Sequence, residues 1–401
     1  MPGPARTPTG GIGARVREFR TIRGLTLTEL GRRAHLSPSQ LSRIESGTRS
    51  VSSTVEANIA KALGVTVSVL HGLPYVHMLQ QDRLDALLTP ISSALGSWDL
   101  PAEDVPVRSL EELRTEVDRI VRLRLRTAFA EVAEALPPLL VAASALAQTH
   151  AAPGERREQA HALQAELART AAIVAYRLGF IELARLALSR MAMAAPHSGD
   201  PAQVAIERME RSLMTHGQAS RADRGVALMR VALRELDDDG TARMRAVRGA
   251  LYLRAAQLAL QDGDATAAED WLGQAGELAA QLGDVYHYSL MFGPFGVALA
   301  RMGLDNERSD HGAALRRAAR MRLPAGCPPT LAAHFLIRRA RAEAWTAHPE
   351  EALASLHAAR RTAPQLTRYH PHVHEAVGAL LRARPGAPGE RLREFALWSG
   401  V

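Results

Sequence analysis

A short polar segment near the N-terminus, residues 38–43, carries side chains that could recognise nucleic-acid bases. Arg43 can pair with guanine O6 and N7, and Gln40 can pair with adenine N6 and N7. On a helix, this segment would present a polar face that fits a major groove about 12 Å wide. The residues expected to contact bases are Pro38, Ser39, Gln40 and Arg43.

Other groupings that could support chemistry are incomplete. His370, His372 and His374 alternate, and in an extended segment they would share one face as metal ligands could. Only Glu375 could complete such a set, so we expect no metal and no cofactor. The run Asp-Asp-Asp-Gly at 237–240 lacks the further ligands of a calcium loop. No phosphate-binding glycine loop, nucleophile elbow or HExxH motif is present, so we expect no enzyme.

Local signals predict the helices that would hold the polar segment. A first helix is expected over 12–22, and the residues Thr-Leu-Thr-Glu at 26–29 form the capping box of a second. The residues Ser-Pro-Ser-Gln at 37–40 form another box, with proline at the tolerated first helical position, and Gly47 ends this third helix. A further box at 53–56 begins a fourth. Two short helices joined by a tight turn make a helix-turn-helix.

The distribution of charge supports nucleic-acid binding. Residues 1–72 contain ten basic and four acidic side chains, which is +6 of the chain's formal +7. A small basic module joined to a nearly neutral body is typical of a nucleic-acid binder.

Composition favours an all-α protein. Aromatic residues are only 4% of the chain, whereas alanine and leucine, which have high helix propensity, are abundant after about residue 75. The single cysteine, Cys327, excludes an internal disulfide framework. No apolar run approaches the roughly 18 residues needed to cross a membrane, and the longest, 136–146, carries two prolines. We therefore expect a cytoplasmic protein.

The segments 24–47 and 59–65 resemble the Cro/phage-repressor-type (Xre) helix-turn-helix family. The resemblance covers about residues 12–70 and implies double-stranded DNA as partner, with bases contacted at Ser39, Gln40 and Arg43. Glu45 matches a position that is mainly structural. The phosphate-contacting residues that the resemblance implies are Arg15, Thr28, Ser42, Arg49 and Ser50.

Two residues depart from the family's pattern. Leu27 stands where the family usually has a glutamine that contacts a phosphate, so that contact is in doubt. His35 replaces the usual glycine of the turn, which is acceptable if this residue adopts the left-handed conformation.

The chain after residue 110 contains a degenerate repeat. Turn-like residues, Gly179, Gly217, Gly263, Gly303 and His348, follow one another at steps of 38, 46, 40 and 45 residues, each between Ala-rich helices. This pattern predicts stacked helical hairpins. It resembles an array of tetratricopeptide repeats, although ordinary bundle packing is an alternative.

A repeat array usually binds its ligand on the concave face. The candidates there are Tyr176, Arg248, Tyr252, Gln257, Tyr288, Phe292, His334 and Arg338. Peptide-binding relatives typically use asparagines, of which this chain has only Asn58 and Asn306. This scarcity weakens the hypothesis of a peptide ligand, and a small molecule, a protein partner or no ligand stay equally open.

Taken together, the sequence predicts an all-α chain with a flexible arm at 1–11 and a four- to five-helix DNA-binding bundle at 12–72. A linker with a short helix follows at 73–109, and an α-solenoid of helical hairpins at 110–401 would serve as sensor and dimerisation domain. The predicted function is a homodimeric transcription regulator. The alternative is a protein-interaction scaffold whose N-terminal domain has lost specific DNA binding.

Overall fold

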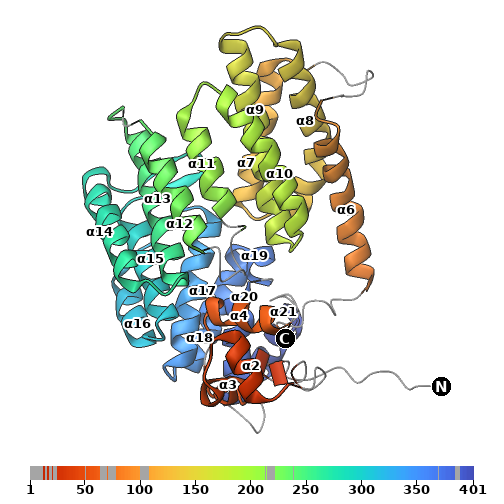
Figure 1. Ribbon diagram of the computed structural model, residues 1–401. Helices are drawn as coiled ribbons and strands as arrows, with labels where there is room; N and C mark the ends of the chain where they lie inside the picture. Colours follow the sequence, from red (N-terminus) through yellow and green to blue (C-terminus); the bar gives the residue numbers. More distant parts are fainter. Residues whose placement is uncertain are drawn as a thin grey trace, which may run out of the picture.

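The computed structural model confirms the all-α prediction (Figure 1). It describes residues 12–13, 16–17, 20, 25–49, 51–63, 70, 78–99, 108–212, 214, 222–237, 239–368, 370–383 and 389–401.

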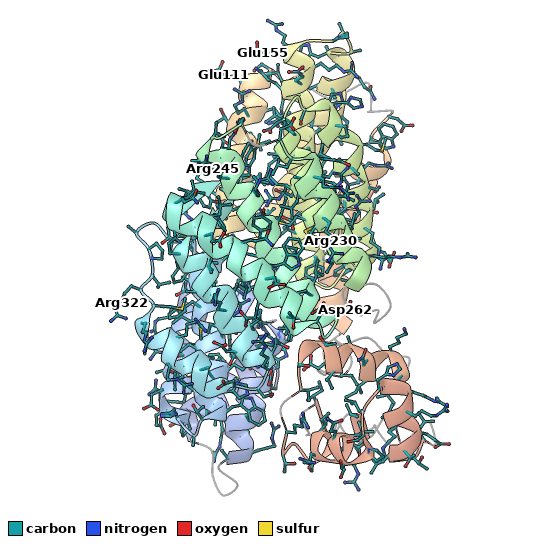
Figure 2. All side chains as sticks on the ribbon, turned by 60° about the vertical axis from the view of Figure 1, so that its left-hand side comes forward. Glu111, Glu155, Arg230, Arg245, Asp262 and Arg322 are labelled. Atoms are coloured by element: carbon teal, nitrogen blue, oxygen red, sulfur yellow. The ribbon has the colours of Figure 1, made fainter. Side chains whose placement is uncertain are left out.

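The N-terminal domain is a small bundle around its own core. Its helices are α2 (Leu27–Ala34), α3 (Pro38–Glu45) and α4 (Ser53–Leu63), and residues 12–13, 16–17 and 20 are also helical. The fully buried side chains of this core include Val16, Leu30, Leu41, Ile59 and Leu63. This separate core makes the domain a distinct unit beside the larger body, as Figure 2 also shows.

The body is a succession of antiparallel helical hairpins. Its first part comprises α6 (Met78–Gly96), α7 (Leu110–Leu125), α8 (Phe129–Thr149), α9 (Glu155–Arg177), α10 (Ile181–Ala194), the 3-10 turn η2 (Ala195–His197), α11 (Pro201–Ser212) and α12 (Ala222–Glu235). Its second part comprises α13 (Ala242–Gln261), α14 (Ala265–Leu282), the hairpin β1 (Val285–His287) and β2 (Leu290–Phe292), α15 (Pro294–Glu307), α16 (His311–Arg320), α17 (Pro329–Trp345), α18 (Pro349–Thr362), α19 (Pro364–Arg368), α20 (Pro371–Ala383) and α21 (Glu390–Ser399).

The predicted repeat turns are located correctly in three places and incorrectly in one. Gly179 and Gly263 join α9 to α10 and α13 to α14 with positive φ, and His348 immediately precedes α18. Gly303 instead lies inside α15, and the turn comes at Ser309, with φ 61°. The sequence position expected at Gly217 lies outside the described residues. The α-solenoid is thus built from hairpins of unequal length.

The body begins earlier than expected. The predicted linker, 73–109, contains the 19-residue helix α6. Leu88, Ile91 and Leu95 of α6 lie in the same hydrophobic core as α7, α8 and α9. Their burial adds apolar contact area that a solvated linker would not have, so this helix is a structural part of the body.

One helix of the described residues, α8, is long and apolar enough to cross a membrane, which the sequence analysis did not expect. The two prolines at 137 and 138 lie within the helix rather than ending it. More than half of its apolar window, 56%, is buried inside the protein. It packs against α6, α7 and α9, and this is the environment of a core helix.

The two ends of the body meet. The backbone N–H of Phe129, at the start of α8, donates to Oε1 of Gln365 in α19 at 2.9 Å. Arg177, at the end of α9, lies 3.4 Å from His334 of α17. Helices separated by more than 150 residues are therefore in contact, and the solenoid curves back on itself (Figure 1).

Candidate nucleic-acid interface

Helix α3 is positioned by contacts that its own sequence supplies. Ser37 Oγ accepts from the N–H of Gln40 at 3.2 Å, and Gln40 Oε1 accepts from the N–H of Ser37 at 3.0 Å, which confirms the predicted capping box. His35, between α2 and α3, has φ 57° and ψ 42°, so it adopts the left-handed conformation in place of a glycine. Leu41 and Ile44 are buried, and they fix α3 to the domain core.

The opposite face of α3 is polar and solvent-exposed. The predicted base-contacting residues Pro38, Ser39 and Arg43 are all exposed, as is Ser42. The guanidinium of Arg43 makes one recorded hydrogen bond, from Nε to the carbonyl oxygen of Ser39 at 3.3 Å. Its terminal nitrogens are directed to no described carboxylate, so they are available to a base edge.

The Gln40 side chain also caps α3, and this limits the ways in which it could contact a base. Its side chain is half-buried, and Oε1 is already engaged by the backbone of Ser37. A carbonyl oxygen has two lone pairs, so Oε1 can still accept one further bond, and Nε2 can donate. Contact with an adenine is therefore compatible with the cap, but its geometry is set by the backbone at Ser37.

The predicted phosphate-contacting residues are partly described. Thr28, Ser42 and Arg49 are exposed, on α2, on α3 and in the loop after α3 respectively. Arg15 and Ser50 lie outside the described residues. Leu27 is half-buried and packs against the domain core, so this position contributes apolar contact instead of a phosphate ligand.

The carboxylates described in this domain are engaged elsewhere. Glu45 accepts two hydrogen bonds from the Arg20 guanidinium, at 2.7 and 3.0 Å, which fits its expected structural role. Glu29 accepts from the N–H of Thr26 at the start of α2, and this bond lowers its pKa. Glu56 is buried, with only 3% of its surface exposed. Among the described residues of the domain, the exposed cations are Arg17, Arg32, Arg33, Arg43, Arg49 and Lys61.

Helix α4 begins one residue earlier than the predicted cap implies. The hydroxyl of Ser52 accepts from the N–H of Val55 at 3.4 Å. The side chain of Ser53, on which the predicted box depends, lies outside the described residues.

The turn after α3 lies against the body. Gly47 has φ 69°, and a Cβ added there would lie 2.8 Å from Cδ of Arg382 on α20. Neither a left-handed conformation nor this close approach suits a residue with a side chain. The glycine thus serves both the end of α3 and the contact between the domains.

We expect Gly47→Ala to lower the free energy of unfolding by about 1–2 kcal/mol, because alanine is strained at positive φ. Urea denaturation followed by circular dichroism measures this. The control is Gly276→Ala inside α14, where an added Cβ meets nothing within 4 Å and a small stabilisation is expected. Equal changes in the free energy of unfolding for the two variants would contradict the role of Gly47 in the turn.

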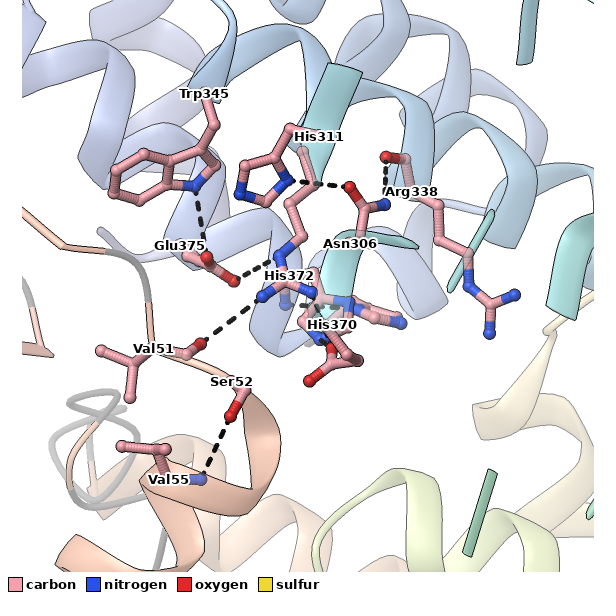
Figure 3. A network of polar contacts seen from close by, with 12 residues as sticks. Val51, Ser52, Val55, Asn306, His311, Arg338, Trp345, His370, His372 and Glu375 are labelled. Carbon is pink, nitrogen blue, oxygen red and sulfur yellow. Dashed lines mark hydrogen bonds and ion pairs between the residues drawn. The ribbon is translucent and has the colours of Figure 1, made fainter. Parts of the chain in front are cut away.

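A buried polar network joins the N-terminal domain to the body (Figure 3). At its centre is Arg341 of α17, which is 1% exposed and forms ion pairs with Glu375 at 3.0 Å and Glu307 at 2.7 Å. Its Nη2 donates to the carbonyl oxygen of Val51 at 3.5 Å. Trp345 Nε1 donates to Glu375 at 3.2 Å. Burial raises the pKa of Glu375 to about 7, although Arg341 acts in the opposite direction.

His311 is a neutral member of the same region. Asn306 donates through Nδ2 to the carbonyl oxygen of Arg338, so its Oδ1 accepts from Nδ1 of His311 at 3.0 Å. The ring stacks on Trp345, with centroids 6.0 Å apart. Burial lowers the pKa of His311 to about 4, with Arg341 acting in the same direction.

The lowered pKa of His311 predicts that the folded protein loses stability in acid. The unfolded chain binds a proton at His311 near pH 6.5 and the folded chain does not, so stability falls as pH drops from about 6.5 to 4. We expect His311 to account for about 2 kcal/mol lost between pH 7 and pH 5. The measurement is urea denaturation at both pH values for wild type and His311→Gln. Subtracting the variant's change in unfolding free energy between the two pH values from that of wild type removes the contributions of other groups, such as Glu375. If the two changes are equal, the prediction is refuted.

The predicted ligand-binding residues do not form one site. Phe292 is 0% exposed and its ring lies over Gly249, so it belongs to the core. Arg248 donates to the carbonyl oxygens of Leu233 and Leu236 at the end of α12, a structural contact.

The aromatic candidates likewise have internal partners. Tyr288 occupies the two-residue turn of the β-hairpin and donates its hydroxyl proton to Asp200 at 2.5 Å. Tyr252 stacks on Trp271, with ring centroids 5.8 Å apart. Gln257 is exposed on α13. Tyr176 precedes Arg177 at the end of α9, His334 lies 3.4 Å from Arg177, and Arg338 is one helical turn from His334 on α17.

The three alternating histidines do not share a face. Helix α20 begins at Pro371, so His372 and His374 are helical, and His374 Nε2 lies 2.8 Å from the carbonyl oxygen of Arg368. In the part of the chain that the structure describes, no group of three or more metal-ligating side chains could hold an ion.

Sequence reasoning missed the residues of the domain junction. Arg341 and Arg382 occur in Ala-rich helices without any motif, and their partners Val51 and Gly47 are about 300 residues away in sequence. No local pattern in the sequence marks these residues as partners.

Comparison with known proteins identifies one domain family, at the N-terminus. No curated protein matches it. A solved structure, PlcR of Bacillus thuringiensis in complex with the peptide PapR7 and DNA, is similar at 14% identity with a TM-score of 0.37, covering 78% of this chain and 94% of PlcR. Residues 12–71, which contain α2, α3 and α4, match the family described as a helix-turn-helix domain.

Proposed function

We propose that this protein is a sequence-specific, DNA-binding transcription regulator of the cytoplasm that acts by binding and has no catalytic activity. The observation that carries the proposal is the exposed polar face of α3, with Arg43 free to reach a base edge. The engagement of Glu29, Glu45 and Glu56 elsewhere supports it, because the domain surface is then dominated by cations.

The proposed assembly is a homodimer on an inverted-repeat operator. Each α3 would lie in a major groove, with half-sites about 34 Å apart. Arg49 and Thr28 would contact phosphates and fix the register of α3 on the duplex. The helical body would bind a small molecule, a peptide or a protein partner, and the Arg341 network would link it to the N-terminal domain.

The test is selection of bound duplexes from a random DNA pool by the full chain. The expected result is an enriched inverted repeat whose binding weakens steeply with salt. Light scattering at micromolar concentration tests the dimer, and a monomeric mass would contradict it. If no motif is enriched, the scaffold alternative, in which the body binds a partner and the N-terminal domain only docks, replaces this proposal.

A further inference from the structure

The body contains several guanidinium groups that lie inside the protein and are neutralised there. Arg124 is 4% exposed and pairs with Glu166 at 2.8 Å. Arg169 is 2% exposed and pairs with Glu210 at 2.9 Å. These pairs follow from the high cost of removing a cation from water without a counter-charge.

Three other arginines of the body have no such counter-charge and are more accessible to solvent, because Arg177 is exposed and Arg254 and Arg338 are half-buried. Arg177 ends α9, Arg254 lies in α13 and Arg338 lies in α17. No described carboxylate is within ion-pair distance of any of them. Arg338 donates to the carbonyl oxygen of Leu299, and the recorded polar contact of Arg177 is with His334 Nε2 at 3.4 Å.

These arginines belong to one cluster, which we call the basic cluster. The charge of Arg177 lowers the pKa of Arg254, and the charges of Arg177 and Arg338 both lower the pKa of His334. His334, which Arg177 contacts, and Arg338 are four residues apart on one face of α17. The surrounding protein also lowers the pKa of each arginine, to about 10 at Arg338. The His334 and His370 rings are 5.3 Å apart, which continues the cluster towards α20.

The groups that face the basic cluster do not neutralise it. They are Tyr176, Glu210, Glu307, Arg341, His370, His372 and His374. Of the two carboxylates, Glu210 is engaged by Arg169 and Glu307 by Arg341. Burial lowers the pKa of His334 and of His370, so both are neutral at pH 7. The cluster therefore holds an uncompensated positive charge.

We propose that Arg177, Arg254 and Arg338 form a binding site for a small organic anion that carries carboxylate or phosphate groups. Guanidinium groups bind both kinds of oxyanion through paired, charge-assisted hydrogen bonds. Neutral His334 and His370 add donors or acceptors beside them. This site would deepen the proposed function. It rests on that function in one respect, namely that the body acts as a sensor.

The site would connect the ligand to the N-terminal domain. Arg338 and Arg341 are three residues apart on α17, which places them on neighbouring positions of one helix surface. Arg341 contacts Val51 directly before α4. An anion that ties α9 and α13 to Arg338 would therefore act on the helix that holds the domain junction.

The experiment is isothermal titration of the full chain at low ionic strength with two probes, citrate and pyrophosphate. We expect at least one probe to bind, and Arg177→Gln and Arg254→Gln to weaken it at least tenfold. The probe that binds more tightly distinguishes a carboxylate from a phosphate ligand. The matched control is Arg230→Gln, an exposed arginine of α12 labelled in Figure 2, which should leave the affinity unchanged.

Thermal melting gives a readout that does not depend on measurable heat. Without anions, Arg254→Gln should match or exceed the wild-type Tm, because it removes an uncompensated charge, and it should lose the rise in Tm that the probe causes. The proposal is overturned if neither probe binds, if both cluster variants bind normally, or if Arg254→Gln melts lower. DNA selection with Arg177→Gln separates the two hypotheses, because loss of this site leaves the operator motif intact.

Discussion

Arg341→Ala should reduce the free energy of unfolding by about 3–5 kcal/mol, because it leaves two carboxylates inside the protein without their cation. Arg341 is 1% exposed and pairs with both Glu307 and Glu375. The loss also removes the hydrogen bond to Val51. Urea denaturation followed by circular dichroism measures the change, and proteolysis between the domains should accelerate in parallel.

The pH dependence of this loss provides a sharper test. Without Arg341, the pKa of Glu375 should rise above its present value of about 7, since burial would act unopposed by that cation. The variant's deficit should therefore be larger at pH 8 than at pH 6, where the carboxyl group can take up a proton.

The double variant Arg341→Met with Glu375→Gln is the control, because it removes cation and anion together and should recover part of the stability. A deficit below about 1 kcal/mol in Arg341→Ala, or one that does not change with pH, would contradict the network's role.

The sequence predicted the helix-turn-helix domain in detail because its structure depends on short-range patterns. The capping boxes at Thr26 and Ser37 involve side chains three residues apart, and both are present. The left-handed conformation of His35 is likewise a property of one turn. Such features need no knowledge of distant parts of the chain.

The body was predicted at the level of hairpins, but its surfaces were not. Helical spacing shows which residues share a face and does not show whether that face meets solvent, a neighbouring hairpin or the far end of the solenoid. Phe292 was a ligand candidate and is core, whereas Arg177 and Arg254 were not candidates and lie in the basic cluster. The contact between Arg341 and Val51 spans 290 residues, which no local pattern encodes.

Arg43→Ala should weaken binding to the selected operator by about 1–3 kcal/mol, or about 5- to 150-fold, and relax the base preference at one symmetric position. The guanidinium of Arg43 is exposed and its recorded hydrogen bond is a long one to Ser39. Stability should therefore change by less than about 0.5 kcal/mol, as for surface substitutions in general. Selection from a random duplex pool, with wild type and variant in parallel, measures both affinity and base preference.

Arg49→Ala is the matched control, since Arg49 is also an exposed arginine but lies in the loop after α3. A phosphate contact carries no sequence information, so this variant should bind all duplexes more weakly, with the slope of affinity against salt smaller by about one. If Arg43→Ala behaves as Arg49→Ala does, with equal losses on operator and scrambled DNA, then Arg43 contacts the backbone. The bases would then be contacted by Ser39 and Gln40, whose cap at Ser37 limits the geometry of that contact.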